Sequence, residues 1–330
     1  MMKIAMVMAG DEEGGLEKHV VELTNGLKCR GHTVTLIAHE KYQIRVEADF
    51  IAVDLSKSRR NLFTLYHLYK VIKKLQPDII HVHGNKAAAM VGSLLPYLDF
   101  PSIATLHSRK KNTKMFRKFN TVIAVSPNAA EVLNHPNVLT VLNGITPPVL
   151  NPNILKNDPP VVLAVGRLVP VKGFDVLLHA WKSVQGAELW IVGEGFEESR
   201  LKAFIHEHGL SDSVKMLGFR DDVLQLMQKS SLYVMSSHYE GCPYTMVEAL
   251  LCEIPMVSTA VGAMTMLLPQ KNLTPVNDAS ALATAINRCL ENLAQAHQDC
   301  QESFAYAKQY LVLDGMITQI EKAYRDTTHS

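Results

Sequence analysis

Short apolar runs alternate with segments of helical spacing along most of the chain. The first run, residues 3–8, is followed by glycines and then by Leu16, Val20, Leu23 and Leu27, which recur at the interval of one helix face. The same order repeats, and we expect strands over residues 3–8, 33–38, 78–82, 102–106, 121–125, 138–142, 161–165, 189–192, 214–217, 231–235 and 255–258. Strands that alternate with helices in this way form parallel sheets, so the sequence predicts an α/β fold.

A cluster of prolines divides this alternation into two halves. Pro147, Pro148, Pro152, Pro159 and Pro160 lie close together, and such a segment continues neither a helix nor a strand. We therefore expect a linker over residues 147–160 between two Rossmann-like domains, 1–146 and 161–308. Beyond residue 278 the apolar spacing is helical, over residues 279–293 and again near 309–325.

Composition narrows the class of protein. The 330 residues are 47% hydrophobic and 20% charged, as in a globular protein, and the net charge of +1 argues against a nucleic-acid binder. No stretch approaches the roughly 20 apolar residues that span a bilayer, and the N-terminal apolar run ends at acidic residues, unlike a signal peptide. The five cysteines form no Cys-x-x-Cys pair, which indicates reduced thiols in a cytoplasm.

Two carboxylates follow the apolar run 231–235. Glu240 falls on the loop after this strand, and Glu248 falls in the second turn of a helix that begins near Pro243. Ligands of open α/β sheets bind at this carboxyl edge, where helix N-termini present unpaired N–H groups to anions. Carboxylates there can accept hydrogen bonds from neighbouring sugar hydroxyls. The pair therefore indicates a site for a hydroxyl-rich anionic ligand.

Two cations occupy the strand-to-helix loop after residues 161–165. Arg167 and Lys172 stand among glycines there, in the sequence Gly-Arg-Leu-x-x-x-Lys-Gly. An arginine fork and a lysine point charge can together neutralise a diphosphate without a metal ion. The alternative is that each forms an ordinary surface ion pair.

Three histidines lie near the ends of two predicted strands. His81 and His83 are two apart on a strand and point the same way, which leaves a metal site open as a minor alternative; no third ligand is evident nearby in the sequence. Packed and hydrogen-bonded imidazoles are the favoured interpretation of this pair. His107 ends the strand 102–106, at the ligand-binding edge, where it either binds a ligand or plays a structural part.

Residues 109–118 form the strongest local concentration of charge. The segment holds Arg109, Lys110, Lys111, Lys114, Arg117 and Lys118 without an acidic residue, and Met115 and Phe116 lie among them. Such a basic amphipathic segment can contact anionic lipid headgroups or an acceptor phosphate. A solvated basic face is the alternative.

Several of these motifs together resemble the retaining glycosyltransferases of family 4. The matching elements are Gly14-Gly15-Leu16-Glu17, the segment from Pro77 to Gly84, His107, Asn143-Gly144, Gly166-Arg167 with Lys172-Gly173, Gly193-Glu194-Gly195, and the Glu240–Glu248 pair. They occur in family order over most of the chain. The resemblance implies the GT-B architecture: two facing Rossmann-like domains with the active-site cleft between them, and a terminal helix, about 309–330, that returns to the first domain.

The resemblance also implies roles for individual residues. Arg167 and Lys172 would bind the diphosphate and stabilise the leaving group, while Glu240 and His107 contact the transferred sugar, so these four are the candidate catalytic residues. Glu248 would bind the ribose hydroxyls. The donor-binding set comprises Gly14, Gly15, Gly166, Arg167, Lys172, Gly218, Phe219, Glu240, Gly241, Cys242, Pro243, Tyr244, Thr245 and Glu248. No Asp-x-Asp sequence lies near a strand end, and the resemblance implies neither a metal ion nor a cofactor.

The activity that the resemblance implies is retaining transfer of a hexose or N-acetylhexosamine. The donor would be a nucleotide-diphosphate sugar, with UDP favoured and GDP open, and the acceptor a glycan or lipid-linked molecule of bacterial polysaccharide or lipopolysaccharide synthesis. We expect a cytoplasmic protein that binds no nucleic acid, with attachment to the inner membrane surface through residues 109–118 left open.

Two departures from the family pattern leave the donor undecided. Glu253 stands where a glycine is usual, and Met266 stands where many members have a glutamate. A nucleotide-sugar epimerase of similar architecture and a non-catalytic glycosyltransferase-like subunit are the alternatives. An NAD-dependent dehydrogenase would need the dinucleotide fingerprint Gly-x-Gly-x-x-Gly, which this chain lacks.

Overall fold

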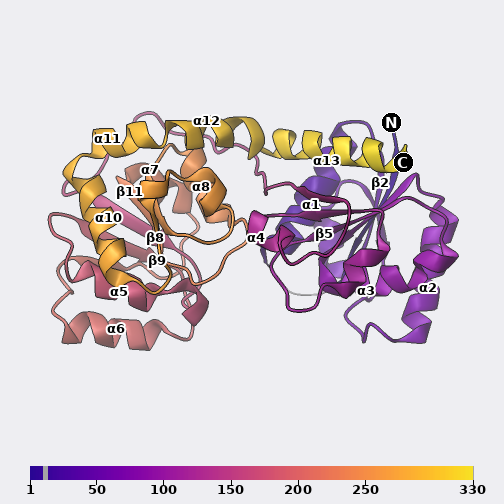
Figure 1. Cartoon of the computed structure of the whole chain (residues 1–330), viewed down its shortest axis with the longest axis horizontal. Coiled ribbons are helices and arrows are strands. Elements are labelled where there is room, and N and C mark those ends of the chain that lie inside the picture. Colours follow the sequence, from indigo (N-terminus) through magenta and orange to yellow (C-terminus); the bar gives the residue numbers. More distant parts are fainter. Residues whose placement is uncertain (10–13, 330) are drawn as a thin grey trace. The chain divides into compact units, whose positions relative to one another are not determined.

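The computed structural model describes residues 1–9 and 14–329, which form two compact units. Unit 1 comprises Met1–Ile145 and Tyr310–Ser330, and unit 2 comprises Thr146–Gln309. Gly10 and the acidic residues 11–13, part of the expected glycine loop, lie outside the described residues. Each unit is a parallel α/β sheet with helices on both faces, so the predicted pair of Rossmann-like domains is confirmed (Figure 1).

Unit 1 is built on a parallel sheet of seven strands in the described part of the chain. Its order is β3-β2-β1-β4-β5-β6-β7. The strands are β1 (Lys3–Met8), β2 (Thr33–Ala38), β3 (Asp49–Ala52), β4 (Ile79–His83), β5 (Ser102–Leu106), β6 (Thr121–Ala124) and β7 (Val138–Thr140). The central strands β4 and β5 are buried throughout because helices cover both faces of a parallel sheet.

Two hydrophobic cores lie on opposite faces of this sheet. One packs α2 (Leu62–Leu75), α3 (Gly84–Leu94) and α4 (Pro127–Ala130) against the strands. The other packs α1 (Gly15–Cys29) and the C-terminal helix α13 (Leu313–Thr328). Short 3₁₀ helices η1 (Glu40–Arg45), η2 (Leu95–Tyr97) and η3 (Lys114–Lys118) complete the unit. The end of the chain therefore supplies part of the core of the domain that its beginning builds.

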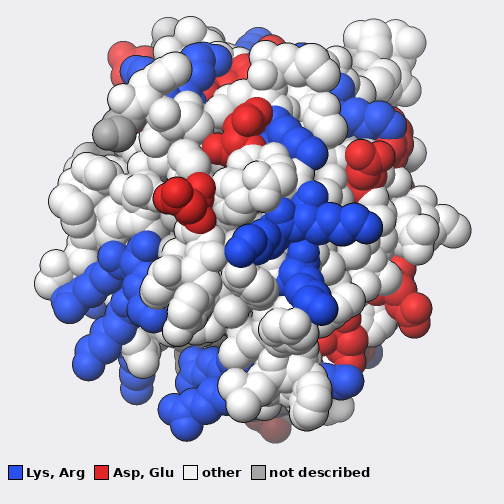
Figure 2. All heavy atoms as spheres, turned by 90° about the vertical axis from the view of Figure 1, so that its right-hand side faces the viewer, with Lys and Arg blue, Asp and Glu red and all other residues white. Residues whose placement is uncertain are grey.

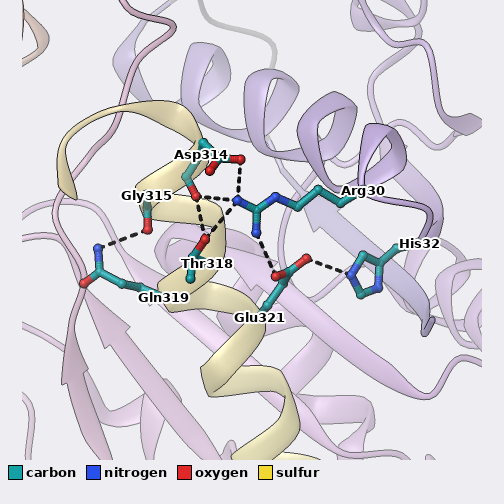
Figure 3. A network of polar contacts seen from close by, with 7 residues as sticks. All are labelled: Arg30, His32, Asp314, Gly315, Thr318, Gln319 and Glu321. Atoms are coloured by element: carbon teal, nitrogen blue, oxygen red, sulfur yellow. Dashed lines mark hydrogen bonds and ion pairs between the residues drawn. The ribbon is translucent and has the colours of Figure 1, made fainter. Parts of the chain in front are cut away.

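A polar network fastens α13 to the end of α1 (Figure 3). The Arg30 guanidinium donates to Glu321 Oε2 at 2.8 Å, to the Asp314 carbonyl at 2.8 Å and to Thr318 Oγ1 at 2.9 Å, and it also contacts the Asp314 carboxylate. Glu321 is in turn bonded to His32 Nε2 at 3.0 Å. Beneath this network Ile317 and Met316 of α13 are buried against the sheet.

Unit 2 repeats the design with a six-stranded parallel sheet in the residues described. Its order is β10-β9-β8-β11-β12-β13. The strands are β8 (Val161–Val165), β9 (Glu188–Val192), β10 (Val214–Met216), β11 (Leu232–Met235), β12 (Met256–Thr259) and β13 (Leu273–Thr274). The helices are α5 (Phe174–Trp181), α6 (Glu198–Glu207), α7 (Val223–Lys229), α8 (Tyr244–Leu251), α9 (Met264–Leu267), α10 (Ala279–Glu291), α11 (Leu293–Asp299) and α12 (Gln301–Tyr310), with η4 (Pro170–Lys172) and η5 (Gln270–Asn272) between them.

Most predicted strands form within one or two residues of their expected bounds. Two short edge strands, β3 and β13, were not predicted, because four and two residues give too little periodicity to recognise. The helix expected over 279–293 ends at Glu291, since the Asn292 side chain accepts from Gln295 N–H and caps a new helix. Among the described helices, none has the length and apolar character to cross a membrane.

Candidate functional site

An ion pair joins two loops at the carboxyl edge of the unit 2 sheet. Lys172 Nζ lies 2.6 Å from Glu240 Oε1, and their side chains are 19% and 11% exposed. Ser237 Oγ donates to the same Glu240 oxygen at 2.7 Å. The sequence places the lysine after β8 and the glutamate after β11, and these strands are neighbours in the sheet. The fold thus brings together a cation and a carboxylate that the sequence separates by 68 residues.

Close backbone packing fixes the lysine loop. Gly173 has φ +62°, and a Cβ there would lie 2.2 Å from the Ser236 carbonyl oxygen. Ser236 Oγ donates to the Lys172 carbonyl at 3.0 Å, and His238 N–H donates to the Val171 carbonyl at 2.8 Å. Only glycine satisfies both the left-handed backbone and the contact. The β8 loop is therefore held directly against the β11 loop.

The backbone on either side of Arg167 is held by the loop after β9. Leu168 N–H donates to the Glu194 carbonyl at 2.8 Å, and Gly166 N–H donates to the Val192 carbonyl at 2.9 Å. Gly193 and Gly195 permit this approach, since a Cβ on either would lie within 2.2 Å of a carbonyl oxygen of the first loop. Arg167 itself is exposed. An exposed guanidinium can meet a ligand as a charged fork.

Glu248 is half-buried in the second turn of α8, as predicted. The preceding loop, residues 241–243, is anchored because Ala263 N–H donates to the Gly241 carbonyl at 2.8 Å. Gly262 permits that approach: it has φ +56°, and a Cβ there would lie 2.2 Å from the same oxygen. Burial raises the pKa of the nearby Tyr233 phenol, which keeps it neutral beside the two glutamates.

The remaining donor-binding candidates lie along this edge with different exposures. Cys242 is buried, whereas Pro243, Tyr244 and Thr245 are half-buried at the start of α8. Gly218 has φ +65° and accepts from Gly193 N–H at 2.8 Å. Phe219 is 73% exposed and makes a flat apolar surface available at the end of β10. Such a ring suits stacking against a nucleotide base.

The two departures from the family pattern have different consequences. Glu253 adopts φ +53°, a left-handed conformation that explains why glycine suits this position. Its carboxylate contacts Lys308 and lies 4.0 Å from His297 Nε2, on the surface. Met266 is 47% exposed after Val261-Gly262. A thioether there supplies no charge, so this chain lacks the carboxylate that many members have.

Unit 1 gathers four histidines near the carboxyl ends of β4 and β5. His81 is fully hydrogen-bonded, with Nδ1 2.7 Å from the Tyr324 hydroxyl and Nε2 2.7 Å from Thr105 Oγ1. His83 Nδ1 lies 3.2 Å from His107 Nε2, which is within hydrogen-bonding distance. The interpretation of His81 and His83 as packed, hydrogen-bonded imidazoles is thus confirmed: His83 is buried, and its two nitrogens face His107 and the Met6 sulfur.

Sequence reasoning missed the fourth histidine, His19. It projects from α1 and is 2% exposed, and its ring centroid lies 4.8 Å from that of His107 and 5.5 Å from that of His83. Its helix is placed here because α1 begins against the end of β4: a Cβ on Gly84 would lie 2.9 Å from Leu16 Cδ1. The sequence did hold a signal for this: His19 lies about one helical turn after the Gly14-Gly15 start of α1, close to the ligand-binding edge of the sheet.

Burial keeps these imidazoles neutral. It lowers the pKa of His19 to about 4, an effect that the nearby Asn143 amide partly opposes, and it lowers the pKa of His81 to about 3. The pKa values of His83 and His107 are also far below the ordinary value, because of burial first and neighbouring imidazoles second. Gly14 and Gly15 stand at the N-terminus of α1, beside this cluster.

A basic surface lies along α2, α3 and the segment 109–118 of unit 1. A hollow of about 420 Å³ there is lined by Arg59, Arg60, Leu62, Leu65, Ala89, Ser93, Asn112, Lys114 and Met115. Leu62 and Phe63, at the start of α2, are 78% and 88% exposed. Figure 2 shows many Lys and Arg side chains on one face of the molecule. The surface therefore combines cations with exposed apolar side chains.

Both halves of the chain match known protein families. Residues 13–147 match the family model described as Glycosyltransferase Family 4, and residues 150–305 match that of Glycosyl transferases group 1. The chain is 29% identical over 276 residues to an uncharacterized glycosyltransferase of Methanocaldococcus jannaschii, covering 76% of each protein. It is 25% identical to the lipopolysaccharide core biosynthesis glycosyltransferase LpsE of Rhizobium meliloti, covering 84% of this chain and 86% of LpsE.

Solved structures share the fold at low sequence identity. The structure of Anabaena Alr3699/HepE in complex with UDP aligns with a TM-score of 0.84 and 20% identity, over 98% of this chain and 100% of that one. The apo lipopolysaccharide outer core galactosyltransferase WaaB aligns with a TM-score of 0.83 and 18% identity, over 98% and 99%. Together with the ordered motifs, these matches show that the chain is a glycosyltransferase enzyme of the GT-B fold and belongs to the group 1, family 4 glycosyltransferases.

Proposed function

We propose that this enzyme transfers a hexose or N-acetylhexosamine, with retention of anomeric configuration, from a UDP-sugar to a glycan or lipid-linked acceptor of cell-surface polysaccharide synthesis. The proposed pathway class rests on relatives such as LpsE and the amylovoran biosynthesis glycosyltransferase AmsD of Erwinia amylovora. The choice of UDP rests on the UDP and UDP-glucose complexes of the structural neighbour Alr3699/HepE.

The observation that carries the proposal is the Lys172–Glu240 pair at the carboxyl edge of unit 2. The lysine ammonium and the Arg167 guanidinium would neutralise the diphosphate and stabilise the charge that develops on the leaving group. Glu240, already oriented by Ser237, would accept hydrogen bonds from hydroxyls of the transferred sugar. Glu248 would bind the ribose hydroxyls, and Phe219 the base.

His107 and the Gly14-Gly15 turn are the proposed sugar contacts of unit 1. A neutral imidazole can donate a hydrogen bond to a sugar hydroxyl or accept one from it, and no charge has to be buried for this. With the diphosphate held by two cations, front-face departure and attack would retain the anomeric configuration. The proposed reaction requires no metal ion and no cofactor, because the cations and helix N-termini supply the electrostatic stabilisation.

A ligand panel tests the donor. A ligand that binds only the native state raises the melting temperature. At a concentration of one hundred times its Kd it adds about 2.7 kcal/mol to the free energy of unfolding. We expect UDP and UDP-sugars to raise the Tm equally with and without EDTA. A shift with GDP alone would replace the UDP assignment, and the absence of any shift would contradict the donor site. The anomeric configuration of the product, measured by NMR, tests retention.

The acceptor side is proposed to meet an anionic, amphiphilic surface. The basic segment 109–118 and the hollow beside it place Arg59, Arg60 and Lys114 next to exposed Leu62 and Phe63. Cations attract phosphate groups, and apolar side chains favour acyl chains at a membrane interface. The proposed enzyme therefore works at the membrane surface, where a lipid-linked acceptor would be presented to it.

A further inference from the structure

The buried histidines of unit 1 have a geometry that donor binding does not account for. One ring nitrogen from each of His19, His83 and His107 lies within 4.8 Å of the other two. The three residues come from α1, β4 and the end of β5. Within the described residues no other group of three such side chains comes together. Neither ring nitrogen of His19 has a hydrogen-bond partner at normal geometry, and its side chain is 2% exposed. A buried polar group in this state calls for a physical explanation.

We propose that His19, His83 and His107 form a binding site for a divalent transition-metal ion of the zinc class. Imidazole nitrogen is a preferred ligand of such ions, and three histidines with one open position make a recurrent tetrahedral zinc set. A hard ion such as Mg²⁺ or Ca²⁺ prefers oxygen ligands and is not expected here.

The hydrogen bonds around His83 leave one of its ring nitrogens unprotonated, as a metal ligand must be. His83 Nε2 lies 2.9 Å from the Met6 sulfur, which can only accept, so Nε2 carries the proton. Nδ1 is therefore the unprotonated nitrogen, and it faces His107 Nε2 at 3.2 Å. That separation is close to the edge of about 3.3–3.4 Å expected for a tetrahedron with metal–nitrogen bonds of about 2.0–2.1 Å. Two corners of the proposed site are thus already spaced for a metal ion.

The third corner requires His19 to move. A rotation of its ring that brings one nitrogen closer by roughly 1 Å or more would complete the set at the bond lengths of zinc. When His19 rotates it gives up only its interaction with the Asn143 side chain, because neither ring nitrogen has a partner at normal hydrogen-bond geometry. His107 would shift its proton from Nε2 to Nδ1, so three dative bonds form without redox change or net proton release. Water would take the fourth position, because His107 is only half-buried.

His81 does not belong to the proposed site. Although it precedes His83 by two residues, both its nitrogens are bonded, to Tyr324 and Thr105. The sequence pattern had paired His81 with His83 as the alternative metal ligands. In the structure His83 instead lies beside His19 and His107, and these three are the proposed metal ligands.

Binding is tested with metal alone and untagged protein. We expect Co²⁺ to bind one ion per chain with the visible absorption of a tetrahedral site, and Zn²⁺ to displace it. His19→Gln should weaken Co²⁺ binding at least about tenfold, the minimum effect seen even for outer-shell changes. His179→Gln, which alters an exposed pair with His208 whose ring centroids lie 6.4 Å apart, should leave binding unchanged. Equal affinity in wild-type and His19→Gln protein, or an octahedral spectrum, would overturn the proposal.

A second measurement does not depend on the folding of a variant. Carbethoxylation of histidines in the wild-type protein, mapped by mass spectrometry, should be slowed by Zn²⁺ at His107 and not at His179. Equal labelling with and without Zn²⁺ at both positions would also overturn the site.

An inhibition assay links the site to the proposed function, on which this step rests. Zn²⁺ would take His107 away from the transferred sugar, so transfer should fall with Zn²⁺ and recover as donor concentration rises. If Co²⁺ binds as described and transfer is not inhibited, the metal site is supported and the proposed sugar contact of His107 is wrong. If transfer is absent under all conditions while Co²⁺ still binds, only the proposed function fails.

Discussion

Lys172 Nζ and Glu240 Oε1 are 2.6 Å apart on two adjacent loops, and both side chains are more than four-fifths buried. The pairing holds the ammonium in place before any ligand arrives, so little side-chain entropy remains to be lost on binding. Breaking such a pair leaves a partly buried charge without its counterion.

Replacing Lys172 by Ala should abolish transfer and leave the fold intact. Removing a preorganised charge at a developing anion costs about 10²–10³ in rate, and loss of the diphosphate contact adds to this effect. Lys182→Ala, an exposed lysine just beyond α5, serves as the control. Steady-state kinetics with circular dichroism would decide the matter; wild-type activity in Lys172→Ala protein would disprove the diphosphate role.

Gly173→Ala should destabilise the protein and reduce transfer, because the added Cβ would lie 2.2 Å from the Ser236 carbonyl oxygen. Gly209→Ala is a matched control: its φ is +66°, and nothing lies within 4 Å of the added atom. The control should lose only the left-handed penalty, about 1–2 kcal/mol. Urea denaturation of both variants provides the comparison. Equal losses would show that the contact with Ser236 relaxes freely.

Stability should fall as the pH drops below about 6.5. The pKa of His19 is lowered to about 4 and that of His81 to about 3, so both are neutral in the folded protein when the unfolded chain has begun to bind protons. Stability is therefore complete above pH 6.5 and is lost as the pH falls toward these values. At pH 5 each histidine should cost about 2 kcal/mol relative to pH 7.5.

Denaturant unfolding at the two pH values measures this loss. His19→Gln should remove about one histidine's share of the pH dependence, whereas His206→Gln, on the exposed face of α6, should retain all of it. A free energy of unfolding that is the same at pH 7.5 and pH 5 would show that the imidazoles become charged without cost.

Arg30→Ala should loosen the C-terminal helix. The side chain is 24% exposed and bonds Glu321, Thr318 and the Asp314 carbonyl, so its removal leaves Glu321, which is 14% exposed, with His32 alone. We expect a loss of about 1.5–3 kcal/mol, the value of hydrogen bonds to charged groups, and faster amide exchange in α13. Lys202→Ala breaks an exposed i,i+4 pair with Glu198 and should cost no more than about 0.5 kcal/mol.

Charge reversal at Lys110 and Lys111 should weaken binding to vesicles that contain phosphatidylglycerol. Each basic residue near an anionic surface contributes about 1 kcal/mol, so the double Lys→Glu variant should partition at least about tenfold less. Lys182→Glu with Lys202→Glu, exposed in unit 2, carries the same charge change as a control. Equal flotation of both variants, or no flotation of the wild type, would contradict the membrane contact.

The sequence alone determined the alternation of strands and helices in both units. Buried parallel strands must be continuous apolar runs, and their glycine-rich loops must stand before helices, so strands such as β2 and β8 were predicted with their observed bounds. The motif residues Arg167, Lys172, Glu240 and Glu248 were likewise found by their local spacing. These features depend on residues that are only a few positions apart in the sequence, and a periodic pattern of apolar residues reveals order over that short distance.

Tertiary structure decided what spacing could not express. The order of strands in the sheet makes β8 and β11 adjacent, and only then does Lys172 meet Glu240. The same holds for His19, which no local pattern joined to His83 and His107, because three different elements carry them. Burial then lowers the pKa of each imidazole, and burial is a property of the packed core rather than of any segment of the chain.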